Sequence, residues 1–298
     1  MNYQEFKHQI LSDLKNELGS DVKVTIQDII KNNDTHLDGL TILSPQHNLS
    51  PTIYLNYYYQ QYEHGRSLSA IVTDIFNTYR NNCPTGHIDI TFFTDYDKVK
   101  SHIIMKLVNY DRNRELLSQI PHYRFLDLAI VFNCLLESGP TGTATILIHN
   151  HHLPYWNITR DDLYALAVQN TPKLMHYDLR NMTAVLRELF SEEPDFPSDT
   201  FSDSICPMYV LSNRQKLNGS VCILYDNLLR DFANRLGCDF YILPSSVHEV
   251  LLVPANGHTS CQELSVMVRD VNSSQLSREE ILSDHVYYYS RESNEITM

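Results

Sequence analysis

Two histidines and an aspartate lie at a spacing typical of a metal site. His149 and His151 are one residue apart, and Thr159 and Asp162 follow after a gap of seven residues. Two imidazoles and one carboxylate can hold Zn²⁺ and leave a fourth position for a water molecule that the metal makes acidic. The spacing therefore predicts a zinc site at His149, His151 and Asp162, with hydrolysis as its chemistry.

The same residues resemble the motif of a known enzyme class. The order His-x-His, seven residues, Ser or Thr, two residues and Asp is similar to that of JAMM-type zinc metallohydrolases, and Asn150 also matches the bacterial RadC-type proteins. The resemblance implies a glutamate general base upstream. Neither Glu137, in a predicted hairpin loop, nor Glu115, on a predicted surface helix, can be assigned that role, and residue 152 is His where the motif usually has Pro.

A second interpretation of Thr159 and Asp162 needs no metal. Thr-x-x-Asp directly before an apolar helical pattern is a capping box, in which the threonine and the acid satisfy the first backbone N–H groups of the helix. Leu163, Leu166 and Ala167 supply that apolar pattern. The zinc hydrolase is therefore the alternative function, and a capped helix is the other explanation of the same residues.

Ser246 and His248 form a second candidate for catalysis. A strand over residues 247–253, extended back to the serines, would place both side chains on one face. Residues two apart in a strand lie about 7 Å from each other, which is too far for the hydrogen bond that activates a serine nucleophile. The motif predicts a turn at Pro244 followed by a strand with polar residues at its start.

Composition excludes several function classes. The net charge of −13 argues against a nucleic-acid or anionic-membrane partner, because such binding depends on Lys and Arg. No stretch approaches the roughly 18 apolar residues that cross a bilayer. There is no Gly-x-Gly-x-x-Gly or P-loop motif, so the common forms of nucleotide chemistry are not expected.

The cysteines indicate a cytoplasmic protein. None of the six forms a Cys-x-x-Cys pair, and the first residues form an amphipathic helical pattern and not a signal peptide. Widely spaced cysteines without a secretion signal predict reduced, mostly buried thiols. They lie at Cys83, Cys134, Cys206, Cys222, Cys238 and Cys261.

The order of elements predicts an α+β fold with antiparallel or mixed sheets. Hairpins alternate with helices, and a purely parallel sheet would need a crossover between every pair of strands. The central hairpin is expected at 125–136 and 143–149. Other expected elements are helices at 1–18, 96–109, 161–169, 178–190, 227–236 and 262–272, and strands at 22–26, 37–43, 88–93, 208–211, 220–224, 240–243, 247–253, 286–289 and 295–297.

A tyrosine-rich stretch runs from Tyr54 to Tyr62. Tyrosines in such a cluster either form a binding surface or pack their rings against a sheet with the hydroxyls near water. Further along the chain, residues 191–205 are rich in Pro, Ser and acidic side chains, as linkers are. We therefore expect an N-terminal α+β region at 1–190, a linker at 191–205 and a C-terminal α+β region at 206–298 packed closely on the first.

Several segments resemble a known bacterial family over essentially the whole chain: SPTIYLNYYY, FFTDYDKVK, FLDLAIVF, ATILIHNHHL, LAVQNTPKL and YILPSSVHEVLLVP. They are similar to domain of unknown function 5688, with a weaker similarity to domain of unknown function 1444. The resemblance implies a bacterial cytosolic protein with a shared fold, and it supplies no catalytic residues.

Taken together, these observations predict a non-enzymatic cytoplasmic bacterial protein that binds another protein or a small ligand and uses no cofactor. Abundant Tyr and Asn suit polar and aromatic contacts with such a partner. The alternative is the zinc-dependent hydrolase at His149, His151 and Asp162.

Overall fold

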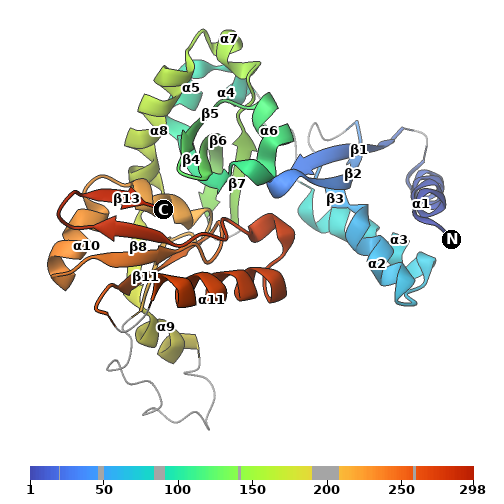
Figure 1. Ribbon diagram of the computed structural model, residues 1–298. Helices are drawn as coiled ribbons and strands as arrows, with labels where there is room; N and C mark the ends of the chain where they lie inside the picture. Colours follow the sequence, from blue (N-terminus) through green and yellow to red (C-terminus); the bar gives the residue numbers. More distant parts are fainter. Residues whose placement is uncertain (20, 46–49, 84–90, 140–141, 190–207, 258–259) are drawn as a thin grey trace. The chain divides into compact units, whose positions relative to one another are not determined.

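The computed structural model describes residues 1–19, 21–45, 50–83, 91–139, 142–189, 208–257 and 260–298. Backbone contacts divide the described chain into two compact units. The first unit comprises Met1–Lys31 and Thr35–Phe92, and the second comprises Asn32–Asp34 and Phe93–Met298. Figure 1 draws the first unit in blue and cyan and most of the second in green to red.

The sequence-based division at 191–205 is not tested, because that segment lies outside the described residues, and it stays a prediction. Within the described residues, β8 (Tyr177–Asn181) from the predicted first region shares a sheet with β9 (Tyr209–Asn213) from the predicted second region.

The first unit is a three-stranded antiparallel sheet with helices, in the strand order β1-β2-β3. Its elements are α1 (Tyr3–Leu18), β1 (Lys23–Lys31), β2 (Thr35–Leu43), β3 (Ile53–Tyr54), α2 (Leu55–Glu63) and α3 (Leu68–Asn82). Helix α1 begins with a capping box in which Asn2 and Glu5 each bond the other's backbone N–H. Its buried residues recur at three- and four-residue spacing and meet the buried residues of β2 and α3 in one core: Phe6, Ile10, Leu14, Leu40, Ile42, Ile71 and Ile75.

The second unit contains two antiparallel sheets. The four-stranded sheet has the order β4-β6-β5, with β7 also paired to β6. The elements of this part are α4 (Thr91–Thr94), α5 (Tyr96–Val99), β4 (Ile103–Asn109), α6 (Arg114–Gln119), β5 (His122–Phe125), β6 (Leu128–Gly139), β7 (Gly142–Leu147), α7 (His152–Trp156) and α8 (Arg160–Leu174). Helix α8 is fixed to β4 by Thr171, whose Oγ1 accepts the Met105 N–H at 3.0 Å.

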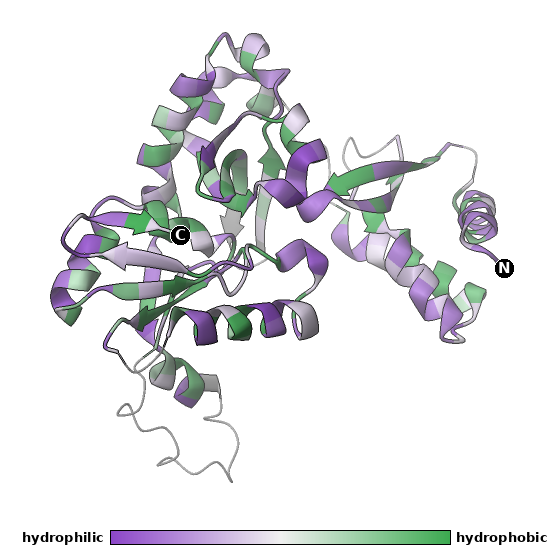
Figure 2. Ribbon diagram, in the orientation of Figure 1, coloured by the Kyte–Doolittle hydropathy of each residue, from purple (hydrophilic) through white to green (hydrophobic). Residues whose placement is uncertain are grey.

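The six-stranded sheet has the order β13-β12-β10-β11-β9-β8. Besides β8 and β9, its elements are α9 (Met182–Leu189), α10 (Leu228–Leu236), β10 (Phe240–Leu243), β11 (Val250–Pro254), α11 (Cys261–Ser274), β12 (Tyr287–Ser290) and β13 (Glu295–Thr297). Helix α11 shows alternating hydrophilic and hydrophobic patches in Figure 2, and its Leu264 and Val268 are buried in a cluster with Leu243 and Val253. An amphipathic helix thus covers part of the sheet.

The predicted fold class is confirmed. All of the strand pairings in the described residues are antiparallel, and helices accompany each sheet. The predicted central hairpin is confirmed as β6 and β7, which pair from Asn133 with Leu147 to Gly139 with Gly142. No described helix is both long and apolar enough to cross a membrane.

Four local predictions need correction. The helix expected at 96–109 is α5 followed by the strand β4, because β4 is buried on both faces and shows no alternation of polar and apolar residues. The helix expected at 178–190 begins as β8, whose pairing with β9 outweighs its helical pattern. Of the strand expected at 88–93, residues 88–90 lie outside the described residues and the rest is helical.

The strand expected at 220–224 is also wrong. Residues Gly219–Leu224 form a 3-10 helix. The Ser220 N–H and hydroxyl both donate to the carbonyl of Val247, which lies in a loop, so this segment does not pair with a neighbouring strand there. Gly219 is required here, since a Cβ would lie 2.5 Å from the His248 carbonyl oxygen.

Candidate functional site

The first unit contains an open pocket of about 490 Å³. We call it the tyrosine groove. It is lined by Pro51, Thr52, Ile53, Tyr54, Tyr57, Tyr58, Gln61, Thr78 and Asn82. Its volume falls within the range of ligand pockets in proteins, about 300–1,000 Å³.

Local structure explains why these side chains converge. Tyr54 precedes α2, and the residues at 54, 57, 58 and 61 follow helical spacing, so they lie along one face. Thr78 and Asn82 are four residues apart on α3 and share a face of that helix. The groove therefore has one wall from α2, one from α3 and one from β3 with the residues before it.

Specific contacts hold the tyrosine rings. The Tyr54 and Tyr57 rings meet edge to face, with centroids 6.4 Å apart and planes at 88°. The Lys31 ammonium lies 4.6 Å from the Tyr54 ring centroid, so it covers one face of that ring. Tyr57 is 47% exposed, so part of its surface is accessible to a ligand.

The groove wall mixes apolar and polar surface and is uncharged. Its described lining residues include no carboxylate, amine or guanidinium group. The Asn82 amide donates to the Thr78 carbonyl at 2.8 Å, and the Gln61 amide oxygen accepts from Arg66. Each amide has further donor and acceptor capacity, as does the Thr52 hydroxyl. Such a wall suits a neutral ligand that has an apolar face for the tyrosines and hydrogen-bonding groups for the amides.

The tyrosine stretch divides into packed and groove-lining residues: the packed rings contact a helix and not the expected sheet, and the expected binding surface stays a prediction. Tyr59 and Tyr62 pack on α1, and their ring centroids lie 5.3 and 5.7 Å from that of Phe6. Tyr54, Tyr57 and Tyr58 line the groove. The sequence showed the cluster, and the position of α1 decides which tyrosines are covered.

The predicted zinc ligands do not converge. His149 and His151 lie after β7, with ring centroids 5.5 Å apart, and the His149 N–H donates to Nδ1 of His152. Burial lowers the pKa of His149, and it lowers the pKa of His152 to about 4, with smaller effects from neighbouring imidazoles. The His152 ring stacks on Trp156 with centroids 5.4 Å apart, so this loop is a packed aromatic and imidazole cluster.

Asp162 is engaged in its own helix. Its carboxylate accepts the Thr159 backbone N–H at 2.9 Å and the Thr159 hydroxyl at 2.7 Å, and these bonds lower the pKa of Asp162. The capping box is confirmed. In the part of the chain that the structure describes, no group of three or more His, Cys, Asp or Glu side chains is arranged to hold a metal ion.

Ser246 and His248 do not form a catalytic pair. The Ser246 hydroxyl accepts the His248 backbone N–H at 3.0 Å, and Nδ1 of His248 accepts the Asn218 backbone N–H at 3.2 Å. Both residues lie in the loop before β11 and not in a strand. The basic ring nitrogen is thus occupied, and it bonds a backbone amide in place of a serine hydroxyl.

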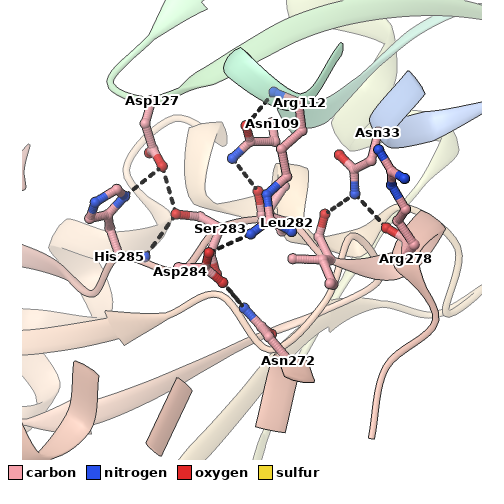
Figure 3. Close-up of polar contacts among 11 residues, drawn as sticks. Asn33, Asn109, Arg112, Asp127, Asn272, Arg278, Leu282, Ser283, Asp284 and His285 are labelled. Atoms are coloured by element: carbon pink, nitrogen blue, oxygen red, sulfur yellow. Dashed lines mark hydrogen bonds and ion pairs between the residues drawn. The ribbon is translucent and has the colours of Figure 1, made fainter. Parts of the chain in front are cut away.

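A buried polar cluster in the second unit was not found from the sequence. Figure 3 shows Asp127 facing Ser283 and His285. The Asp127 carboxylate accepts from the Ser283 hydroxyl at 2.6 Å and the Tyr287 hydroxyl at 2.7 Å, and Nδ1 of His285 lies 3.0 Å from it. The available signal was a lone acid within the apolar segment FLDLAIVF.

Asparagines hold the segment next to this cluster. Asn33 donates to the carbonyls of Arg278 and Ile281, and Asn109 donates to that of Leu282, as Figure 3 shows in part. Asn272 donates to the Ser283 carbonyl. Because Ser283 donates to Asp127 and accepts the His285 backbone N–H, its hydroxyl bonds both partners, and the cluster fixes the chain before β12.

Comparison with known protein families gives a match over nearly the whole chain. The model of a family of unknown function, DUF5688, matches residues 3–291. No curated protein and no solved structure matches the chain. The weaker similarity to domain of unknown function 1444 stays a prediction. Since the match covers nearly the whole sequence, the chain belongs to the family DUF5688.

Proposed function

We propose that this chain is a non-catalytic binding protein of the bacterial cytoplasm, and that its first unit binds a neutral ligand in the tyrosine groove. The ligand is a small molecule or part of another protein. One observation carries the proposal: exposed tyrosine, amide and hydroxyl groups from β3, α2 and α3 line a single uncharged pocket. Concave sites with aromatic walls and a few polar groups are the usual form of ligand sites.

The engagement of the candidate catalytic side chains supports a non-catalytic role. Asp162 accepts two hydrogen bonds from Thr159, and Ser246 accepts a backbone N–H. A serine nucleophile is commonly activated by a base within hydrogen-bond reach. Ser246 bonds a backbone amide and Ser283 bonds a carboxylate, in place of such a base.

Charge and thiol chemistry support the rest of the proposal. The net charge of −13 disfavours nucleic acid and anionic membranes as partners. Burial raises the pKa values of the Cys134 and Cys222 thiols to about 12, which keeps them unreactive, as suits structural thiols in a reducing compartment.

Ligand screening with groove variants tests this proposal. Tyr57→Ala removes an exposed groove residue, and Gln60→Ala, on the neighbouring position of α2 outside the groove lining, is the matched control. Thermal-shift screens against neutral metabolites and peptides should yield ligands that raise the Tm of the native chain and of Gln60→Ala, but not that of Tyr57→Ala. Hits that stabilise all three chains equally would contradict the proposal.

Zinc-dependent hydrolysis at His149, His151 and Asp162 is the alternative function. Elemental analysis of freshly purified, untagged protein decides between the two, with His149→Ala/His151→Ala as the matched variant. About one zinc per chain that is lost in the variant would favour the hydrolase. The binding proposal expects no zinc that depends on these histidines.

A further inference from the structure

We propose that the tyrosine groove takes an extended, uncharged segment of a partner protein, which lies alongside β3 as an added strand. This inference rests on the proposed function and names the ligand class of the same site. It follows from the place of β3 in its sheet, from the helices beside it and from the charge of the groove wall.

Strand β3 is the last strand of its sheet among the described residues. It pairs with β2 through Ile53 with Leu40 and Tyr54 with Gly39, and the sheet order is β1-β2-β3. An edge strand presents backbone N–H and C=O groups on its outer side that can pair with another chain. Residues 51–54, which comprise β3 and the two residues before it, all line the groove.

Helices supply the other walls. Tyr57, Tyr58 and Gln61 come from α2, and Thr78 and Asn82 come from α3. A groove between an edge strand and a helix is the arrangement in which protein modules bind peptides by strand addition, where backbone hydrogen bonds give affinity and side-chain pockets give specificity. Alternate side chains of an added strand would point toward the tyrosines, and the others would point away.

Glycine helps to shape this edge. Gly39 lies opposite Tyr54 in the ladder, and a Cβ at this position would come within 2.7 Å of the Thr52 methyl group and 2.3 Å of Ile29 Cδ1. A side chain at residue 39 would therefore displace the Thr52 methyl group and the end of the Ile29 side chain. The four residues 51–54 span about 10 Å, so the groove matches about four residues of an extended ligand.

The charge of the wall limits the ligand. With no ionic group in the described lining, a charged side chain entering the groove would lose part of its hydration and gain no ion pair from the lining. Two cations contact lining residues from outside it, Lys31 over the Tyr54 ring and Arg66 at the Gln61 amide oxygen, and both disfavour cationic residues there. The lining itself therefore matches polar uncharged, aromatic and aliphatic side chains best.

Selection from a phage-displayed random heptapeptide library tests this inference. The native chain is the bait, and binders that also bind Tyr57→Ala are removed. The selected peptides are then synthesised in three forms, unmodified and with each of the two alternate patterns of N-methylation, and titrated against the native chain, Gln61→Ala and Gln60→Ala. Each pattern removes the backbone donors of one edge of an extended peptide, so one of the two removes those that strand addition requires.

The expected result has three parts. The selected peptides lack charged residues over about four central positions, one of the two patterns of N-methylation weakens binding at least about tenfold, and Gln61→Ala weakens it while Gln60→Ala does not. Circular dichroism should show that the variants fold, since Tyr57 and Gln61 are both exposed.

Other results overturn the inference in distinguishable ways. Peptides whose affinity survives both patterns of N-methylation would exclude strand addition. Failure to select any peptide, with neutral small molecules still binding in a Tyr57-dependent manner, would overturn the peptide inference and leave the proposed function standing. If no peptide or small molecule depends on Tyr57, both proposals fail.

Discussion

The hydroxyl oxygens of Tyr58 and Thr78 lie 3.2 Å apart, and this contact joins α2 to α3 at the wall of the tyrosine groove. The two helices are connected by only a few residues, so the turn and this bond together set the distance between them. The groove therefore depends on a polar contact between its walls as well as on the apolar core beneath it.

Removing this contact should loosen the groove without unfolding the unit. Tyr58→Phe deletes one hydroxyl that is partly exposed, and we expect a loss of about 0.5–1 kcal/mol in the free energy of unfolding, measured with urea. Thr78→Val should cost a similar amount, and the double variant little more than either alone, because both changes remove the same bond. Additive losses would show that the hydroxyls do not interact.

The Asp127 carboxylate should be a main stabilising group of the second unit. It is 8% exposed and contacts Ser283, His285 and Tyr287. Asp127→Asn replaces one carboxylate oxygen, which only accepts hydrogen bonds, by an amide NH2 group, which only donates them. We expect the free energy of unfolding, measured with urea, to fall by about 3 kcal/mol. Tyr287→Phe removes one donor and should cost about 1 kcal/mol. Equal costs would mean that the carboxylate is not the centre of the cluster.

The fold should lose stability in mild acid through His152. Its pKa is lowered from 6.5 to about 4, mainly by burial. A histidine whose pKa is lowered by folding stabilises the native state above its unfolded pKa, and this contribution is lost as the pH falls from 6.5 toward 4. The Tm should therefore decrease across this range.

Replacement variants separate His152 from the other titrating groups. His152→Phe keeps a ring against Trp156 and cannot take up a proton, so its Tm should fall less than that of the native chain between about pH 7 and pH 4.5. His64→Gln, at an exposed histidine of the first unit, is the control. Parallel Tm curves for the native chain and His152→Phe would contradict the assignment.

Loss of the Thr159 cap should weaken the start of α8. Thr159→Ala removes the hydroxyl that accepts the Asp162 backbone N–H at 3.2 Å. We expect the free energy of unfolding, measured with urea, to fall by about 1 kcal/mol. Thr73→Ala, in the interior of α3, is the control and should not destabilise, because alanine is the better helix former. A neutral effect of Thr159→Ala would show that the cap is dispensable.

Local patterns in the sequence predicted the elements that local physics controls. Helix α1, the Thr159 capping box and the β6–β7 hairpin each carry their signal within one segment, as apolar periodicity, a cap motif or a turn. Strand β4 was missed because burial on both faces removes the alternation that distinguishes a strand from a helix.

Contacts between distant residues could not be predicted in this way. Asp127 meets Ser283 and His285 across more than 150 residues, and no local pattern couples them. For the groove, the sequence showed a tyrosine cluster, but helix α2, which places Tyr54, Tyr57 and Tyr58 along one face, was not predicted. Which face stays open depends on how α1 and α3 pack, which only the structure gives.

The most direct test of the binding proposal is isothermal titration of a ligand found in the thermal-shift or peptide screens against the native chain, Tyr57→Ala and Gln60→Ala. We predict that Tyr57→Ala weakens binding at least about tenfold, as expected when an aromatic anchor is truncated, while Gln60→Ala retains the native affinity. Equal affinities for the native chain and Tyr57→Ala would contradict the assignment of the tyrosine groove as the binding site.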